Sequence, residues 1–315
     1  MLDDFLTHYA RSGSEFNVLL ARLFVCFFLV WKILSRDFGF FASFPYEITA
    51  YPVDIYSTES YVFWTGTWLI TDLLTFHWIH WFLPPPSASL LTGVQYGLVS
   101  LIAIWAIFGD IHGKWLSGAI YAALIYLWGY IFRSGQEIDS IALYFGMLIC
   151  LILNRGKNRP ITDLPSTYRG SPTRFAGYVE SNMLLVLCTY YFASGLRKLT
   201  DLLPWEWFQY DLALAVERQR IISQYASGYA PEIFDYLLPL GGFAAVFAAV
   251  VYVSHLVIPF VFFRRELLFH FFLFYAVFHF LTFGVGISFT GYIVVWGCVL
   301  PLHRIISRAE RRSEA

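Results

Sequence analysis

Residues 191–199 read Tyr-Phe-Ala-Ser-Gly-Leu-Arg-Lys-Leu and place two basic side chains, Arg197 and Lys198, at the end of a long apolar stretch. A charge in a membrane-embedded helix is costly and marks a candidate functional site. Desolvation and a neighbouring cation both disfavour the ammonium form, so Lys198 is a candidate base near neutral pH. The alternative is that both side chains extend from a helix end to the lipid headgroups.

The composition around this stretch is typical of a membrane protein. Hydrophobic residues make up 58% of the 315 residues and charged residues only 14%, whereas about 25% of the residues in soluble domains are charged. The apolar runs are long enough for membrane-crossing helices, which need about 20 residues, and do not show the short alternating strands of a barrel. We therefore expect an all-α, polytopic transmembrane helical bundle in an integral, multi-pass location, which is the inner or plasma membrane in a prokaryote.

Eight apolar segments are predicted to cross the membrane, each as one helix. They are residues 16–35, 90–109, 115–133, 139–154, 177–198, 234–263, 266–283 and 284–302. A tryptophan-rich stretch at 60–85 is interrupted by Asp72 and closed by three prolines. Because tryptophan favours the membrane interface, we expect an interfacial aromatic helix there. The whole chain, 1–315, is interpreted as one transmembrane domain.

The basic residues indicate which loops face the cytoplasm. They concentrate in three places: the loop 155–174, the pair Arg264 and Arg265, and the C-terminal segment. The loops 37–89 and 199–233 are instead mainly acidic. With eight spans, this distribution makes residues 1–15 and 303–315 cytoplasmic termini and residues 199–233 an extracytoplasmic loop.

The same topology brings four ionisable residues to the outer ends of their spans: Lys198, His279, Glu137 and Asp139. A lysine, a histidine and two carboxylates at one depth suit proton-transfer chemistry in a partly dry cavity. For His279, a buried ring bonded to a neighbouring carbonyl is the alternative interpretation. Arg22, in the middle of the first span, is expected to pair inside the bundle or reach its inner surface, with contact to a ligand as the alternative.

Metal and nucleic-acid chemistry are not expected. His270 and His279 lie nine residues apart, which on a helix is half a turn out of phase, so they do not face one site. His77 and His80 share a helix face but stand beside Trp78 and Trp81, which indicates an interfacial aromatic belt. The net charge of -1 and the lack of a long basic run argue against a nucleic-acid partner.

The stretch at 191–199 resembles the Y-F-x-A-G-x-x-K-L segment of the vitamin K-dependent gamma-carboxylase and of its bacterial and archaeal relatives, the HTTM (horizontally transferred transmembrane) domain proteins. Two further matches are similar to segments of this family: Phe278-His279 to its F-H pair, and Gly286-Ile287-Ser288-Phe289 to its G-M-F segment. Arg22 falls where the family has an arginine in its first span. The order and spacing of the matches agree from about residue 16 to 302.

The resemblance implies a definite chemistry. In gamma-carboxylases, a lysine at the position of Lys198 acts on a reduced naphthoquinone of the vitamin K or menaquinol type, which with O2 becomes a strongly basic alkoxide. That base removes a proton from the gamma carbon of a glutamate, and the carbanion adds CO2. The resemblance thus implies Lys198 as the base and His279 as a donor to the developing oxyanion. The implied cofactor-binding residues are Tyr190, Tyr191, Arg197, Trp205 and Arg22.

The chain also departs from the family. Where the carboxylases carry an asparagine-histidine pair at the start of a middle span, this chain has Glu137-Ile138-Asp139-Ser140, so Asp139 or Glu137 is the expected replacement. We expect no large soluble domain for binding a propeptide. The first hypothesis is a quinol-dependent, gamma-carboxylase-like membrane enzyme acting on a peptide or small carboxylate at the outer face. The alternative is a non-catalytic accessory subunit that binds lipid or quinone in a larger membrane complex.

Overall fold

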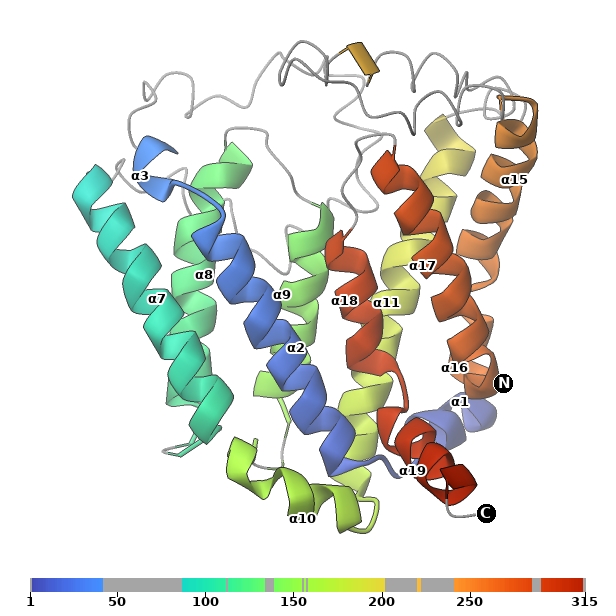
Figure 1. Cartoon of the computed structure of the whole chain (residues 1–315), viewed down its shortest axis with the longest axis horizontal. Helices are drawn as coiled ribbons and strands as arrows, with labels where there is room; N and C mark the ends of the chain where they lie inside the picture. Colours follow the sequence, from blue (N-terminus) through green and yellow to red (C-terminus); the bar gives the residue numbers. More distant parts are fainter. Residues whose placement is uncertain are drawn as a thin grey trace. The chain divides into compact units, whose positions relative to one another are not determined.

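The computed structural model describes residues 2–41, 87–111, 113–133, 139–154, 156, 158–201, 220–221, 241–284 and 290–313. Within these ranges the regular secondary structure is helical, and the only β-type contact is an isolated bridge between Gly13 and Thr173 (Figure 1). The expected all-α class is therefore confirmed for the described part of the chain. The predicted interfacial helix at 60–85 lies outside the described residues, as does most of the loop 199–233.

Eight apolar helices overlap the eight predicted segments. They are α2 (Glu15–Leu34), α7 (Ala88–Phe108), α8 (Trp115–Arg133), α9 (Asp139–Ile152), α11 (Arg174–Asp201), α15 (Gly241–Val257), α17 (Leu268–Gly284) and α18 (Thr290–Val299). The shorter elements are α1 (Leu2–Tyr9), α3 (Phe38–Phe41), the 3-10 turn η2 (Ile161–Asp163), α10 (Leu164–Arg169), α16 (Phe260–Phe263), the 3-10 turn η4 (Arg265–Leu267) and α19 (Leu302–Ser313).

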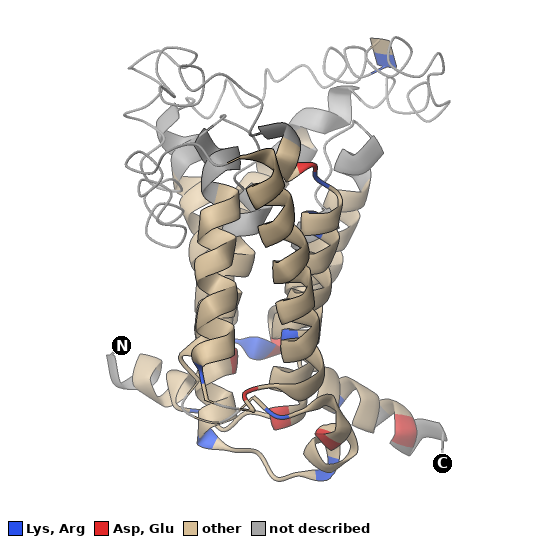
Figure 2. Ribbon diagram, turned by 90° about the vertical axis from the view of Figure 1, so that its left-hand side faces the viewer, with Lys and Arg blue, Asp and Glu red and all other residues tan. Residues whose placement is uncertain are grey.

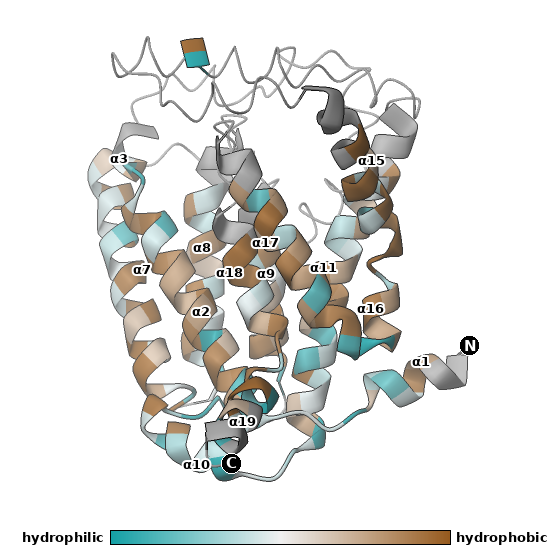
Figure 3. Ribbon diagram, turned by 45° about the vertical axis from the view of Figure 1, so that its right-hand side comes forward, coloured by the Kyte–Doolittle hydropathy of each residue, from teal (hydrophilic) through white to brown (hydrophobic). Residues whose placement is uncertain are grey.

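Two of these helices, α2 and α7, are long and apolar enough to cross a membrane by length and composition. Shorter apolar stretches occur in α8, at Trp115–Trp128, and in α9, at Leu143–Ile152. Hydrophobic residues run along most of the apolar helices, whereas α19 combines hydrophobic and hydrophilic residues (Figure 3). A membrane-crossing length is thus established for two helices of the described chain, and the eight spans stay a prediction.

The chain divides into two compact units. Unit 1 comprises Met1–Leu187 and Val294–Ala315, and unit 2 comprises Cys188–Ile293. The two ends of the chain therefore belong to the same unit. The 28-residue helix α11 begins in unit 1 and ends in unit 2.

The core of unit 1 forms around α2, which packs against α7 and α9. The rings of Phe28 on α2 and Tyr144 on α9 stack with their centroids 3.6 Å apart. On α7, the buried Gln95 donates from Nε2 to the carbonyl oxygens of Ile33 and Arg36, both at 2.8 Å. Carbonyls at a helix C-terminus lack partners within the helix, so this side chain completes the end of α2 inside an apolar environment.

Charge is concentrated at the helix ends of unit 1 (Figure 2). Helix α7 has no charged residue, and Arg133 and Asp139 are the only ones in α8 and α9, each at a terminus. At the end where α2 begins, the Glu180 carboxylate accepts from the Ser14 backbone N–H and from Asn17 Nδ2, both at 3.0 Å. This carboxylate joins the start of α2 to α11.

The C-terminal helix α19 is bound at this same end. The backbone N–H of His303 donates to Asn17 Oδ1 at 2.9 Å, and His303 Nε2 lies 3.0 Å from the Tyr168 carbonyl oxygen in α10. The start of α2, the segment around α10 and the C-terminal helix therefore meet at one end of unit 1. The sidedness prediction requires this arrangement, although which side of a membrane that end faces stays a prediction.

Unit 2 contains the second half of α11 with α15, α16 and α17. The predicted segment 234–263 is interrupted in the structure, because α15 ends at Val257 and α16 begins at Phe260. Pro259 lies between them and lacks the backbone N–H that a continuing helix would use. The N–H of Phe262 bonds instead to the Pro259 carbonyl at 3.1 Å, a tighter 3-10 contact.

The packing of the N-terminal segment on α11 predicts a strong effect of a single methyl group. A Cβ at Gly177 would lie 1.6 Å from the Arg11 carbonyl oxygen, whereas a Cβ at Gly93 on α7 would meet nothing within 4 Å. We expect Gly177→Ala to destabilise the protein by about 2 kcal/mol through overpacking. The matched change Gly93→Ala should be neutral or stabilising by up to about 1 kcal/mol. Thermal unfolding in detergent compares them, and equal melting temperatures would contradict the close contact.

Candidate functional site

The structure describes some of the predicted site residues fully and others only as backbone. Arg197 and Lys198 lie in the last turns of α11, and Asp139 is the first residue of α9, but their side chains lie outside the described part. Glu137 and Trp205 lie outside the described residues. Four predicted site residues are described with their side chains, and all four are buried: Tyr190, Tyr191, His279 and Arg22.

Two of these residues, Tyr191 and His279, are in direct contact in unit 2. The Tyr191 hydroxyl lies 3.0 Å from His279 Nε2, and either group is the donor depending on the tautomer of the ring. Their side chains come from α11 and α17, which are far apart in sequence. Tyr190 packs edge-on against Tyr191 with ring centroids 6.3 Å apart. The structure thus brings together three residues that the sequence assigned to one site.

Further polar residues that the sequence analysis did not select surround this pair. The Tyr275 ring lies 4.4 Å from that of Tyr191, and the Tyr275 hydroxyl is 3.0 Å from Ser254 Oγ. The His255 ring stacks on Tyr275 at 5.6 Å, nearly parallel. A serine and a histidine inside an apolar run carry the same signal as His279, a polar side chain in a segment read as membrane-embedded, and this signal identifies them.

Gly195, in the quoted stretch, permits the close approach of α11 and α15. A Cβ at this position would lie 2.9 Å from His255 Cβ. Small residues at such points let helix backbones pack closely. The glycine therefore holds the His255 and Tyr191 rings near each other, with centroids 5.3 Å apart.

The spacing of α11 relates Lys198 to the Tyr191–His279 pair. Seven residues separate Tyr191 from Lys198, which is close to two helical turns, so both positions share one face of α11 about 10 Å apart along its axis. A buried tyrosine-histidine hydrogen bond holds one proton between two groups that can each donate or accept. The arrangement is suited to donating a hydrogen bond to, or exchanging a proton with, a group bound near the end of α11.

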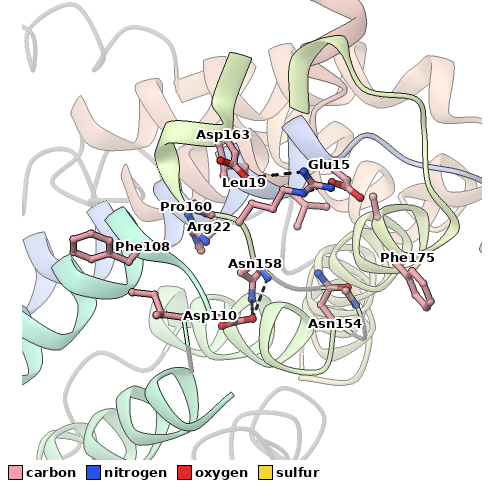
Figure 4. A pocket seen from close by; sticks show the side chains of 15 residues that line it. Glu15, Leu19, Arg22, Phe108, Asp110, Asn154, Asn158, Pro160, Asp163 and Phe175 are labelled. Carbon is pink, nitrogen blue, oxygen red and sulfur yellow. Dashed lines mark hydrogen bonds and ion pairs between the residues drawn. The ribbon is translucent and has the colours of Figure 1, made fainter. Parts of the chain in front are cut away.

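A second polar arrangement lies in unit 1, around a cavity of about 500 Å³. Its walls come from the start of α2, the end of α7, the segment 154–163 and the first turn of α11. Figure 4 shows Arg22, Asp110 and Asn158 among the side chains that line it. None of the lining residues belongs to unit 2.

Arg22 is fully buried at this cavity, with 0% of its surface exposed. Its Nη2 donates to the Ala106 carbonyl oxygen at 3.2 Å, and its guanidinium carbon lies 5.8 Å from the centre of the Trp105 ring. Its Nε and Nη1 atoms are buried and have no hydrogen-bond partner among the described residues. The expected pairing inside the bundle is therefore only partly made, and the ligand contact stays open.

Asp110, which the sequence analysis did not select, is the most highly connected acid of this region. Its carboxylate accepts from Trp105 Nε1 at 3.0 Å, from Lys114 Nζ at 2.6 Å and from the backbone and side-chain N–H groups of Asn158 at 3.0 and 2.9 Å. Burial alone would raise its pKa, but these donors and the Lys114 charge outweigh burial and hold the pKa of Asp110 below its usual value.

Comparison with known proteins gives no match, since no protein-family model fits the sequence and no curated protein or solved structure is similar to it. The resemblance to the gamma-carboxylase family therefore rests on the quoted residues.

The Asp110 contacts predict a specific pH dependence. Because the pKa of Asp110 is depressed in the folded state, its contribution is complete above the unfolded value of about 3.9 and is lost as pH falls through the folded value. We expect Asp110→Asn to destabilise the protein by about 2 kcal/mol at pH 7, since Lys114 and three other N–H donors lose an ionised acceptor. The difference in the free energy of unfolding between the variant and the parent protein should become smaller below about pH 4.

Denaturant unfolding as a function of pH tests this expectation. Asp163→Asn is the matched control, because Asp163 lies 4.0 Å from Arg159 and is partly exposed, and such surface pairs contribute about 1 kcal/mol or less. If the loss of unfolding free energy in Asp110→Asn stays constant down to low pH, the ionised carboxylate is not what stabilises the fold.

Proposed function

We propose that this protein is an integral, multi-pass membrane enzyme of the gamma-carboxylase-like type, which uses a reduced quinone at the outer membrane face. The observation that carries the proposal is the buried hydrogen bond between Tyr191 and His279, on the helix face that also carries Lys198. Buried titratable groups of this kind are characteristic of functional sites. The resemblance of residues 191–199 to the carboxylase segment supports the same chemistry.

The exposed side chains support the membrane location. Phe27 on α2, Tyr96 on α7 and Phe280 on α17 are 68, 59 and 69% exposed. Soluble monomers rarely expose extended apolar surface, whereas lipid solvates such side chains. With α2 and α7 long enough to cross a bilayer, these faces fit a bundle that is surrounded by lipid.

The residues around Tyr191 fit a reduced naphthoquinone by their chemistry. Tyr190, Tyr191 and Tyr275 supply buried aromatic rings, which pack well against a flat ring system. The Tyr191–His279 pair supplies a hydrogen-bonding group for a quinol oxygen. When bound, the quinol supplies a strong base after reaction with O2. Tyr191, His279, Arg197 and Trp205 are the proposed residues for holding it.

The chain's own residues divide the work of binding and proton transfer. Lys198 Nζ, as a neutral amine, accepts a proton at the end of α11. His279 donates a hydrogen bond to developing negative charge, and the Tyr191 hydroxyl fixes the orientation of its ring. Asp139 or Glu137 takes the place of the family's middle-span histidine. The acceptor for CO2 is a peptide glutamate or a small carboxylate.

A non-catalytic accessory subunit that binds lipid or quinone within a larger membrane complex is the second candidate. The observation that favours it is the replacement of the family's asparagine-histidine pair by Glu137-Ile138-Asp139-Ser140. Such a protein would keep the bundle and its aromatic cluster without turnover.

The enzyme proposal predicts a dependence on Lys198 and His279 that neighbouring residues of the same type do not share. Oxygen-dependent conversion of a reduced naphthoquinone to its epoxide should fall about 100-fold or more in Lys198→Met and in His279→Gln, which is the usual size of a general acid or base contribution. The matched controls Lys32→Met, on α2, and His270→Gln, exposed on α17, should keep the parent rate.

Tyr191→Phe should lower the rate less than His279→Gln, because it removes only the hydroxyl that orients the ring. Parent rates in Lys198→Met would end the enzyme proposal. Failure of the parent protein to convert any of several quinols, with binding retained, would favour the accessory subunit.

The multi-pass topology predicts opposite accessibility for two sets of introduced thiols. All four native cysteines are buried, so single cysteines at Ser171, Ser313 and Ser227 can be labelled against a low background. In intact cells of a bacterial host, an impermeant maleimide should label Ser227→Cys and spare Ser171→Cys and Ser313→Cys. Labelling of Ser171→Cys together with Ser227→Cys would contradict the proposed arrangement of spans.

A further inference from the structure

We infer that the cavity around Arg22 binds the phosphate of a lipid whose headgroup is anionic and hydroxylated, as in phosphatidylglycerol. The cavity lies at the end of unit 1 where α10 meets α2, within the part of the chain that precedes residue 188. The inference does not depend on the quinol chemistry proposed for Lys198.

Arg22 has N–H groups that lack hydrogen-bond partners. An arginine has five N–H donors, and the three on Nε and Nη1 have no partner within the described chain. A buried charge whose hydrogen bonds are incomplete is unfavourable, so an anion that accepts from these donors would stabilise this site. Arg22 is completely buried and lines the cavity, so its free donors are available to a ligand in it.

The acids of the cavity are already engaged with other cations. Glu15 Oε2 lies 2.7 Å from Arg159 Nε, and Asp163 lies 4.0 Å from Nη1 of the same arginine. Asp110 is bound to Lys114 at 2.6 Å. Asp110 acts on Arg22 through its charge but is bound to Lys114, and the described residues show no ion pair within 4 Å for Arg22. The engaged acids also leave no carboxylate for an ammonium headgroup.

The lining of the cavity combines polar and apolar side chains. Arg22, Asn154 and Asn158 contribute polar groups, and the apolar side chains are those of Val18, Leu19, Phe108, Ile111 and Phe175. Its volume of about 500 Å³ falls in the range of ordinary ligand sites. A free ion would leave the apolar lining residues without a partner, whereas an amphiphile places its phosphate at Arg22 and its first methylene groups against apolar lining residues.

The hydrogen bonding of Asn158 indicates that the headgroup carries a hydroxyl group. Its Nδ2 donates to Asp110 and to the Leu151 carbonyl, but its Oδ1 is buried and has no partner in the described chain. A buried acceptor without a donor is unfavourable. A glycerol-type headgroup supplies such a donor, whereas a choline headgroup does not.

The turn after α7 keeps space beside the guanidinium. Gly109 has φ +67°, and a Cβ there would lie 2.7 Å from Arg22 Nη1 and 2.0 Å from the Asn158 carbonyl oxygen. A side chain at this position would therefore clash with both groups. The glycine leaves the Nη1 donors open, which is needed if they bind a ligand.

Native mass spectrometry on the full chain, purified in detergent and exposed to equal amounts of phosphatidylglycerol and phosphatidylcholine with identical acyl chains, tests the inference. We expect the parent protein to retain phosphatidylglycerol at least tenfold over phosphatidylcholine. Arg22→Gln should lose at least tenfold of that preference. Lys32→Gln, which removes a cation from the same helix away from the cavity, should keep it.

Two controls complete the test. One distinguishes a lipid phosphate from inorganic phosphate, and the other covers the case in which the variant does not fold. Inorganic phosphate, added in place of lipid, should not raise the melting temperature as phosphatidylglycerol does, and an equal rise would overturn the assignment to a lipid. If Arg22→Gln does not fold, the parent protein alone remains decisive, since equal retention of the two lipids would overturn the site. An unchanged preference in folded Arg22→Gln would do the same.

Discussion

The end of unit 1 that contains the cavity depends on the hydrogen bonds that the Asp110 carboxylate accepts. It receives hydrogen bonds from the end of α7, from Lys114 before α8 and from Asn158 in the segment before α10. In an apolar bundle, each buried polar group needs a partner from the protein itself. One acid therefore fixes three chain segments that hydrophobic packing alone would leave free to slide, and it also sets the wall against which Arg22 lies.

The same requirement is met differently in the two units. At the ends of unit 1, side chains such as Gln95 and Glu180 satisfy backbone groups of neighbouring elements, so their role is structural. In unit 2, two pairs of side chains, Tyr191 with His279 and Ser254 with Tyr275, form hydrogen bonds inside an apolar core. Side-chain pairs buried together in this way are a characteristic setting for chemistry.

The helices were predictable from the sequence because each lies within an apolar run, and His279 because a polar group in such a run stands out. Tyr191 was selected through the resemblance of residues 191–199. The interruption between α15 and α16 at Pro259 was not predicted, because apolar residues flank this proline on both sides. Asp110 was missed because an acid in a short loop is ordinary in sequence. Its importance arises only when Trp105, Lys114 and Asn158 converge on it. The open donors of Arg22 likewise depend on how α7 ends.

The composition of unit 1 from both ends of the chain has a consequence for biogenesis. Residues 188–293 form unit 2, and only afterwards do α18 and α19 return to α2, through contacts such as that of His303 with Asn17. Because chains are synthesised from the N-terminus, α2 gains these contacts only after unit 2 and the residues around His303 have been synthesised. A nascent chain that stalls within unit 2 exposes that face of α2 to the insertion machinery and to quality-control proteases.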